Sequence, residues 1–374
     1  MSTKDLVRIR EGATDLMVPR GFCGRGPGKA SGDVFYNRQM EFSRDVSVML
    51  GSVALEEGSR ALDGLAASGV RGLRMANECG SGARFTLNDR SAEAHELMLR
   101  NAELNGLTDE VTTCCRDLRA LLAEARYAYI DIDPFGTPIG FVDAAVQSCS
   151  NGGIVAVTAT DTAPLAGTYP KTCLRRYGAR SMKSAFSHET ALRILIGYIA
   201  REAAKHDRGI EPVLCFHADH YYRCHIRMRN GARRADQSLE RIGYAVADEA
   251  TLRRGFAEEV SEASREFAGP LWTGELHSGG VVDSLAPTEG LGTRRRCEKM
   301  VDLWRQEVDA PGLFFDVDEL AQRSKRQPPR LSCLLEGLRA HGACASPTHF
   351  APKGVKTDLE AEELLRLFVE LSVP

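Results

Sequence analysis

The sequence predicts an α/β protein that combines a doubly wound parallel sheet with a smaller α+β domain ending in a winged-helix-like unit. Apolar strand-like runs alternate with helical periodicity between residues 60 and 160, and small or glycine-containing turns follow several of these runs. The pattern changes character near residue 235. Because 374 residues exceed what one hydrophobic core usually organises, we expect two domains, 1–235 and 236–374.

The N-terminal segment is expected to form a hairpin, a loop and a helix. Alternating residues 6–10 and 16–18 flank a Glu-Gly turn, which is typical of a hairpin. Residues 20–32 carry five glycines and a proline, which indicates a flexible loop. Amphipathic spacing predicts a helix over 37–50.

The alternating region supplies the predicted sheet. Strands are expected at 60–63, 84–88, 111–115, 127–132 and 154–160, with helices at 73–78, 91–104 and 139–149. A helix over 188–205 and strands at 212–216 and 220–228 follow. Near the C-terminus, helices at 316–324 and 329–341 and two extended pieces within 344–356 give the outline of a winged helix, a common nucleic-acid module.

Composition excludes several classes of protein. The 48 basic and 51 acidic residues give a net charge of −3, which argues against a uniformly cationic nucleic-acid coat. Charges interrupt the first twenty residues and no long apolar run follows, so we expect a cytoplasmic protein without a membrane partner. The eleven cysteines are an odd number without a regular framework, which favours reduced thiols.

One cluster of possible metal ligands lies within residues 214–228. It consists of Cys215, His217, His220, Cys224 and His225. Strand alternation does not collect four of these side chains on one face, so we expect no metal site there.

Small residues and strand-end acids indicate a nucleoside cofactor. Residues 63–69, from Asp63 to Gly69, follow the first strand of the sheet, and small side chains there permit close approach of a ligand. Asp89 ends the next strand and is suited to accept two ribose hydroxyls, and Asp117 after the third strand is placed to contact an adenine. The spacing lacks the dinucleotide pattern Gly-x-Gly-x-x-Gly, so S-adenosylmethionine is the expected cofactor.

The end of the fourth strand predicts the chemistry. An exocyclic amine on a base is a poor nucleophile, because its lone pair is delocalised into the ring. Asp133 and the carbonyl of Pro134 are suited to bind the amino hydrogens, and Phe135 is suited to stack on a flipped base. We expect Asp131, two residues earlier, to point away from Asp133 and to be structural.

These motifs resemble those of the tRNA (guanine-26-N2)-dimethyltransferases in their archaeal form, over nearly the whole chain. The resemblance is carried by VFYN at 34–37, SRD at 43–45, DGLAASGVRGLR at 63–74, DIDPFG at 131–136, TATDTAPL at 158–165 and GPLWTG at 269–274. It implies a Rossmann-like class I S-adenosylmethionine-dependent methyltransferase domain, which transfers one and then a second methyl group to N2 of a guanine at the junction of the D and anticodon stems of tRNA.

The resemblance also implies roles for individual residues. Asp133 and Phe135 would hold the target guanine. Five further residues would line the cofactor site: Phe35, Arg44, Arg74, Asp89 and Asp117. Two departures stand out. Residues 244–267 contain no cysteine, so a zinc site of the family should be absent, and Arg38-Gln39 replaces a usual proline at the start of the 37–50 helix.

Four acid-free or acid-poor basic groups favour an RNA partner despite the acidic total. They lie at 171–183, 223–234, 294–296 and 323–330. We expect a monomer that binds tRNA and not DNA. Two alternatives stay open: a DNA adenine methyltransferase, and a non-catalytic tRNA-binding protein on a methyltransferase fold.

Overall fold

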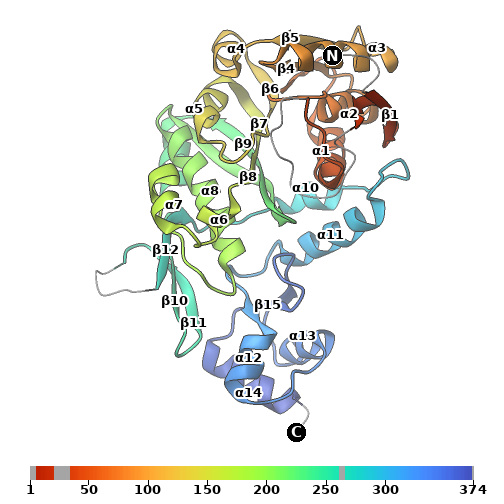
Figure 1. Ribbon diagram of the computed structural model, residues 1–374. Coiled ribbons are helices and arrows are strands. Elements are labelled where there is room, and N and C mark those ends of the chain that lie inside the picture. The colour runs from red at the N-terminus through yellow and green to blue at the C-terminus, as the bar shows by residue number, and fades with distance from the viewer. Residues whose placement is uncertain (1–5, 21–33, 261–265, 373–374) are drawn as a thin grey trace.

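A seven-stranded sheet organises the larger part of the protein (Figure 1). The computed structural model describes residues 6–20, 34–260 and 266–372, so the predicted loop at 20–32 lies almost entirely outside the described residues. The strand order is β5-β4-β3-β6-β7-β9-β8. Their bounds are β3 (Arg60–Asp63), β4 (Arg84–Asp89), β5 (Val111–Cys115), β6 (Tyr127–Ile132), β7 (Cys149–Ala159), β8 (Arg208–Ala218) and β9 (Tyr221–Asn230).

The first five strands of this sheet in chain order are parallel, and β9 and β8 extend it as an antiparallel hairpin. The chain runs outward from β3 to β4 and β5, and then returns to β6 on the other side of β3. Strand order therefore reverses between β3 and β6. In an open α/β sheet this is the place where ligands bind, at the carboxyl ends of the strands.

Helices cover both faces of the sheet. One face packs on α1 (Glu41–Ala54), α2 (Val70–Glu78), α3 (Ala92–Leu104), α10 (Gly279–Ser284) and α11 (Arg294–Glu307). The other packs on α4 (Leu118–Glu124), α5 (Ile139–Ser148), α6 (Thr162–Leu165), α7 (Pro170–Tyr177) and α8 (Ser187–Ala204). Alternation along β6 shows the cause, because Ile130 and Ile132 enter the second core while Tyr129, directly before them, enters the first.

Smaller elements surround this unit. The hairpin β1 (Leu6–Glu11) and β2 (Thr14–Pro19) confirms the prediction, and the predicted 37–50 helix begins as a 3-10 turn, η3 (Arg38–Met40), before α1. A short helix, α9 (Ala232–Leu239), precedes a three-stranded sheet of β10 (Ile242–Asp248), β11 (Arg253–Ala257) and β12 (Phe267–Trp272). Several helices, among them α4, α9, α11 and α14 (Ala361–Leu371), were not predicted from the sequence.

The C-terminal end confirms the winged-helix outline. Helices α12 (Val317–Ser324) and α13 (Leu331–Ala340) precede β14 (Ala345–Pro347) and β15 (Gly354–Thr357), which pair with β13 (Phe315–Asp316), and α14 (Ala361–Leu371) closes the unit. Its core is formed mainly by residues 315–368 and is separate from the two sheet cores. Figure 1 places this unit at the far end of the molecule from α3 and β5.

The domain division at residue 235 stays a prediction. Ala245, Ala268 and Leu271 enter one core of the large sheet, and Val301 and Trp304 of α11 enter the other. Packing therefore joins β10, β12 and α11 to the large sheet, and the separate core begins only near Phe315.

Candidate active site

A cavity of about 1030 Å³ opens at the carboxyl ends of β3, β4 and β6. Its wall includes residues 65–68 of the loop after β3, Asp89 at the end of β4, and residues 133–136 after β6. The two motifs that sequence analysis assigned to cofactor and base thus face the same space. A cavity of this size accommodates a nucleoside-sized ligand and part of a second molecule.

Backbone contacts fix the loop after β3. The amide of Gly64 donates to the carbonyl of Asp131 at 3.0 Å, and that of Ala66 donates to the carbonyl of Asn88 at 2.8 Å. A Cβ on Gly72 would lie 2.1 Å from a methyl carbon of Leu87, so only glycine lets α2 approach the sheet this closely. The Gly72 amide, in the first turn of α2, donates to Asp63 at 3.0 Å.

Asp89 is held in a defined orientation at the wall of the cavity. One carboxylate oxygen accepts from the Ala67 amide and the other from the Ser91 amide, both at 3.0 Å. Each oxygen retains acceptor capacity, since an ionised carboxylate offers about four lone-pair positions. The carboxylate can therefore receive two further hydroxyl donors.

Asp117 and Phe35 also line the cavity, as does Arg44. Asp117 caps α4 through the Arg119 amide at 3.0 Å, and its side chain is half exposed. Arg44 is buried and binds both oxygens of Glu11, at 2.6 and 2.5 Å. Burial opposes the charge of Glu11, but Arg44 and Arg74 outweigh burial and lower the Glu11 pKa to about 2.

Two expected cofactor residues do not line the cavity. Gly69 precedes α2 with φ +79°, and its place is explained by packing, because a Cβ there would lie 3.1 Å from Met98. Arg74 is fully buried and pairs with Glu11, Asp45 and Glu78. The structure thus places Arg74 behind the cavity, in an ion-pair network that fastens β1, α1 and α2 together.

The Asp-Pro-Phe-Gly segment is anchored to Thr160, directly after β7. The amide of Gly136 donates to the Thr160 hydroxyl at 2.7 Å, and the Thr160 amide donates to the carbonyl of Gly136 at 2.9 Å. Phe135 is 58% exposed, and its ring meets that of Phe35 edge to face, with ring centroids 4.7 Å apart. Among the described residues no hydrogen bond engages the Pro134 carbonyl. The exposed Phe135 ring and the Pro134 carbonyl oxygen therefore lie next to Asp133, and both are available to a ligand.

Arg71 is a site residue that sequence analysis missed. It lies in the first turn of α2, and its guanidinium binds Asp133 through Nη2 and the Ser47 hydroxyl through Nη1 at 2.8 Å. Its Nε lies 3.5 Å from Asp131. The side chain is only 5% exposed, so Arg71 fixes Asp133 from within the protein.

The expectation that Asp131 points away from Asp133 is wrong. One guanidinium contacts both carboxylates, because residues two apart along a strand share a face. Asp131 is nevertheless structural, since it is buried and held by both outer nitrogens of Arg223. Burial opposes its charge, but Arg223 and Arg71 outweigh burial and lower its pKa to about 2.

Asp63 has the opposite electrostatic balance. Burial, together with the charge of neighbouring Asp131, raises the pKa of Asp63 to about 7. Its carboxylate would be stabilised by a cation at the cavity wall. No such stabilisation is needed at Asp131, where two arginines already supply it.

Four members of the cysteine and histidine cluster at 214–228 lie in β8 and β9, and His220 lies in the turn between these strands, at the cavity wall. Cys215 and Cys224 face each other across β8 and β9 and are buried, and His225 contacts the carbonyl of Leu214 at 2.9 Å. These side chains fill the core and brace the strands.

Comparison with known proteins extends over almost the full chain. The family model described as N2,N2-dimethylguanosine tRNA methyltransferase matches residues 27–368. The curated tRNA (guanine(26)-N(2))-dimethyltransferase of Methanoregula boonei is 39% identical over 370 residues, covering 95% of this chain and 96% of the relative. The protein of the same name from Pyrococcus abyssi is 36% identical over 377 residues, covering 96% and 97%.

A solved structure shows the same fold. It is described as the complex of Trm1 from Pyrococcus horikoshii with S-adenosyl-L-methionine, and it aligns with a TM-score of 0.87 at 35% identity. The alignment covers 99% of this chain and 100% of that chain.

Proposed function

We propose that this chain, which belongs to the N2,N2-dimethylguanosine tRNA methyltransferase family, transfers methyl groups from S-adenosylmethionine to the N2 amine of guanine 26 in tRNA. One observation carries the proposal. The small-residue loop after β3 and the Asp133 to Phe135 segment after β6 line a single cavity at the point where strand order reverses. The comparisons give no support to a DNA adenine methyltransferase or to a non-catalytic protein.

The cavity fits S-adenosylmethionine. Asp89 retains acceptor capacity for the ribose hydroxyls, and Asp117 and Phe35 lie on the wall available to the adenine. Asp63, whose charge is disfavoured by burial, suits the cationic end of the ligand. When bound there, S-adenosylmethionine supplies the electrophilic methyl group.

The chain's own residues bind the amine and accept its proton. Asp133 and the Pro134 carbonyl accept hydrogen bonds from the two N2 hydrogens, which draws the lone pair away from the base ring. Phe135 stacks on the flipped guanine, and its exposed ring meets Phe35 at the border with the cofactor loop. As N2 forms its new bond to carbon, Asp133 takes the proton that N2 releases.

The test follows label from tritiated S-adenosylmethionine into bulk tRNA, with nucleoside analysis of the product. We expect label in N2-methylguanosine first and in N2,N2-dimethylguanosine later. Label in DNA adenine, or no transfer to any nucleic acid, would contradict the proposal. Mutation of guanine 26 in a tRNA transcript should abolish the label, whereas retained label would move the target to another guanine.

Asp89→Ala should weaken cofactor binding. A carboxylate that accepts from two ribose hydroxyls makes charge-assisted hydrogen bonds worth about 1.5–3 kcal/mol, which corresponds to a roughly 10- to 150-fold higher Kd. Calorimetric titration with S-adenosylmethionine measures this, with Asp109→Ala, an exposed acid just before β5, as the control. An unchanged Kd for Asp89→Ala would assign the ribose contact to another group.

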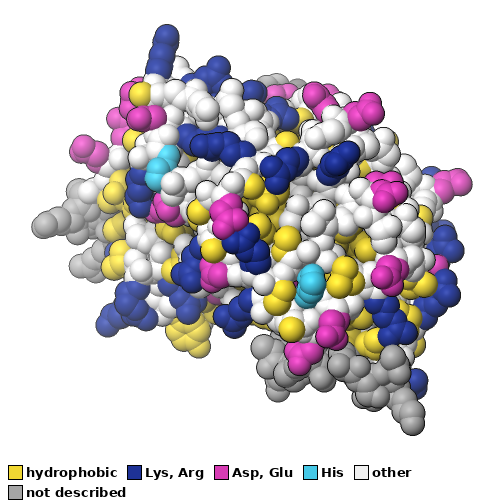
Figure 2. Space-filling view, turned by 90° about the horizontal axis from the view of Figure 1, so that it is seen from above, with side chains coloured by type: hydrophobic (Ala, Val, Ile, Leu, Met, Phe, Trp, Pro, Cys, Tyr) yellow, Lys and Arg dark blue, Asp and Glu magenta, His cyan; other side chains and the backbone are white. Residues whose placement is uncertain are grey.

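The basic groups divide into surface and interior residues. The sequence places Arg223 in a basic group that is expected to face RNA. This prediction is wrong for Arg223, because its side chain is fully buried and bonds Asp131. Arg296 pairs with Asp219 at 2.9 Å and Arg229 with Glu211 at 2.9 Å. Figure 2 shows Lys and Arg side chains crossing the middle of one face beside hydrophobic side chains, with acidic side chains interspersed.

We propose that the C-terminal unit contributes to the grip on tRNA. Lys325, Arg326 and Arg330 lie exposed at the end of α12 and in the turn before α13. Arg323 beside them is engaged by the Ala250 carbonyl. We further propose that the enzyme acts as a monomer in the cytoplasm. Within the described part of the chain, no helix has the length and apolar content to cross a bilayer.

Replacing Lys325, Arg326 and Arg330 by alanine should flatten the salt dependence of tRNA binding. Each lost phosphate contact with duplex removes up to about 0.9 from the slope of log affinity against log salt. Arg366→Ala, an exposed change on α14 of the same unit, serves as the control and should leave the slope unchanged. Wild-type slope in the triple variant would make the cluster an ordinary solvated surface.

A further inference from the structure

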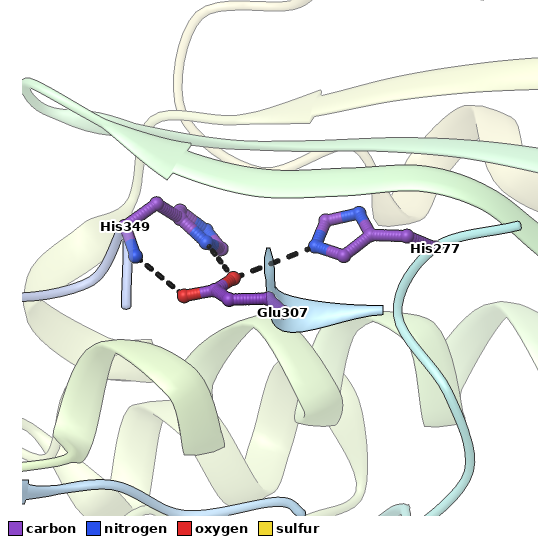
Figure 3. Close-up of side chains that lie close together, drawn as sticks. All are labelled: His277, Glu307 and His349. Atoms are coloured by element: carbon purple, nitrogen blue, oxygen red, sulfur yellow. Dashed lines mark hydrogen bonds and ion pairs between the residues drawn. The ribbon is translucent and has the colours of Figure 1, made fainter. Parts of the chain in front are cut away.

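Two histidines and a glutamate meet in the interior, away from the active site. His277 follows β12, Glu307 ends α11, and His349 lies in the loop between β14 and β15. One potential ligand atom of each residue lies within 4.8 Å of the others. Figure 3 shows the carboxylate of Glu307 between the two imidazole rings. The three side chains are at most 2% exposed.

His277 has unused binding capacity. Within the described part of the chain, neither of its ring nitrogens has a partner at hydrogen-bond distance, although the residue is only 3% exposed. A buried polar group without a partner is costly, so such a group is rarely retained without a use. Its Nε2 is directed at Glu307 and lies 3.7 Å from Oε2 (Figure 3).

We propose that His277, Glu307 and His349 bind a Zn²⁺ ion. Two imidazole nitrogens and one carboxylate oxygen form a ligand set that suits zinc. Ligand atoms about 2.0–2.2 Å from a tetrahedral ion lie roughly 3.3–3.6 Å apart, and the 3.7 Å separation of His277 Nε2 and Glu307 Oε2 is close to that range. His277 and Glu307 also line a second cavity, of about 990 Å³, from which water can reach the fourth position.

Binding the ion requires one local rearrangement. His349 Nδ1 now lies 2.5 Å from Glu307 Oε2, as a hydrogen-bond donor. On metal binding that proton moves to Nε2, which keeps the ring neutral, and the 3.4 Å contact from the His217 amide to Nε2 is lost. Lys356 is the nearby cation, and its charge is offset by Glu189 at 3.4 Å.

The ion would fasten the C-terminal unit to the catalytic sheet. His349 belongs to the separate C-terminal fold, Glu307 belongs to a helix that packs on the sheet, and His277 forms a backbone bridge with Leu214 of β8. The three ligands therefore come from three segments that the chain connects only through long intervening stretches. A shared ion would fix the position of the C-terminal unit relative to the active site.

Metal binding by the full-length protein tests the site. The protein is stripped with a chelator and titrated with Zn²⁺, and Co²⁺ serves as a spectroscopic probe of tetrahedral coordination. We expect one equivalent of Zn²⁺ per chain, a tetrahedral Co²⁺ spectrum and a higher unfolding temperature with the ion. No uptake by the wild-type protein, or uptake of Fe²⁺ but not Zn²⁺, would overturn the assignment.

Variants locate the ion. His277→Ala and Glu307→Gln should each lose stoichiometric uptake, and His349→Gln replaces either variant if it does not fold. The control is His341→Ala, which removes a half-exposed histidine that pairs with Glu363 at 3.3 Å in the same C-terminal unit. Equal uptake by His277→Ala, Glu307→Gln and the wild type would place the metal elsewhere and refute the proposal.

Discussion

Asp133→Asn is expected to lose methyl transfer by about 10²–10⁴-fold while binding S-adenosylmethionine as the wild type does. The amide that replaces the carboxylate still accepts a hydrogen bond through its oxygen, but it cannot take the proton that N2 releases. The side chain stands on the wall of the active-site cavity and is bound on its inner side by Arg71. Cofactor contacts at Asp89 and the loop after β3 are untouched by the change.

Single-turnover transfer and calorimetric cofactor binding together measure this effect. Asp143→Asn is a matched control, because Asp143 lies half exposed on α5 and bonds His206 and Gln147. The control should retain both activity and cofactor affinity. Near-wild-type turnover in Asp133→Asn would remove Asp133 from the proton-transfer role.

Positions set by strand ends could be predicted from sequence. Asp63, Asp89 and Asp133 each end or follow a strand whose apolar pattern is clear, and the carboxyl ends of parallel strands share one edge of the sheet. The structure brings all three to the same cavity wall. The winged-helix outline could also be predicted, because the local spacing of apolar residues indicates its helices and strands.

Positions set by pairing between distant segments could not be predicted. Arg223 lies among other arginines in sequence, and only the neighbouring strands place Asp131 beside it in the interior. Arg74 was expected at the cofactor, yet Glu11 and Asp45 hold it behind the cavity wall. A local charge pattern does not reveal whether a cation faces solvent or a buried carboxylate on another element.

Arg71 is the clearest case of such a hidden residue, and its loss should be nearly as damaging as that of Asp133. Arg71→Ala is expected to lower kcat about 100-fold with little change in cofactor Kd, because misplacing a reacting group by about 1 Å costs this much. The guanidinium joins Asp133 to Ser47 of α1 and approaches Asp131, so it sets where the carboxylate points. Asp131 keeps both contacts with Arg223 in the variant, which preserves the strand ends.

Chemical rescue separates a positioning role from a purely structural one. Arg71 lines the cavity, so truncation to alanine leaves a space that free guanidinium can enter from the active site. Added guanidinium at concentrations that leave the fold intact should restore part of kcat in Arg71→Ala and none in Asp133→Asn. Arg71→Lys, without added guanidinium, should keep only part of the wild-type kcat. A single ammonium group lacks the planar array of donors with which the guanidinium contacts Asp133, Asp131 and Ser47 together. If Arg71→Ala retains wild-type kcat, or if its defect lies only in cofactor Kd, then Asp133 is oriented by the Asp-Pro-Phe-Gly turn and its Thr160 anchor instead.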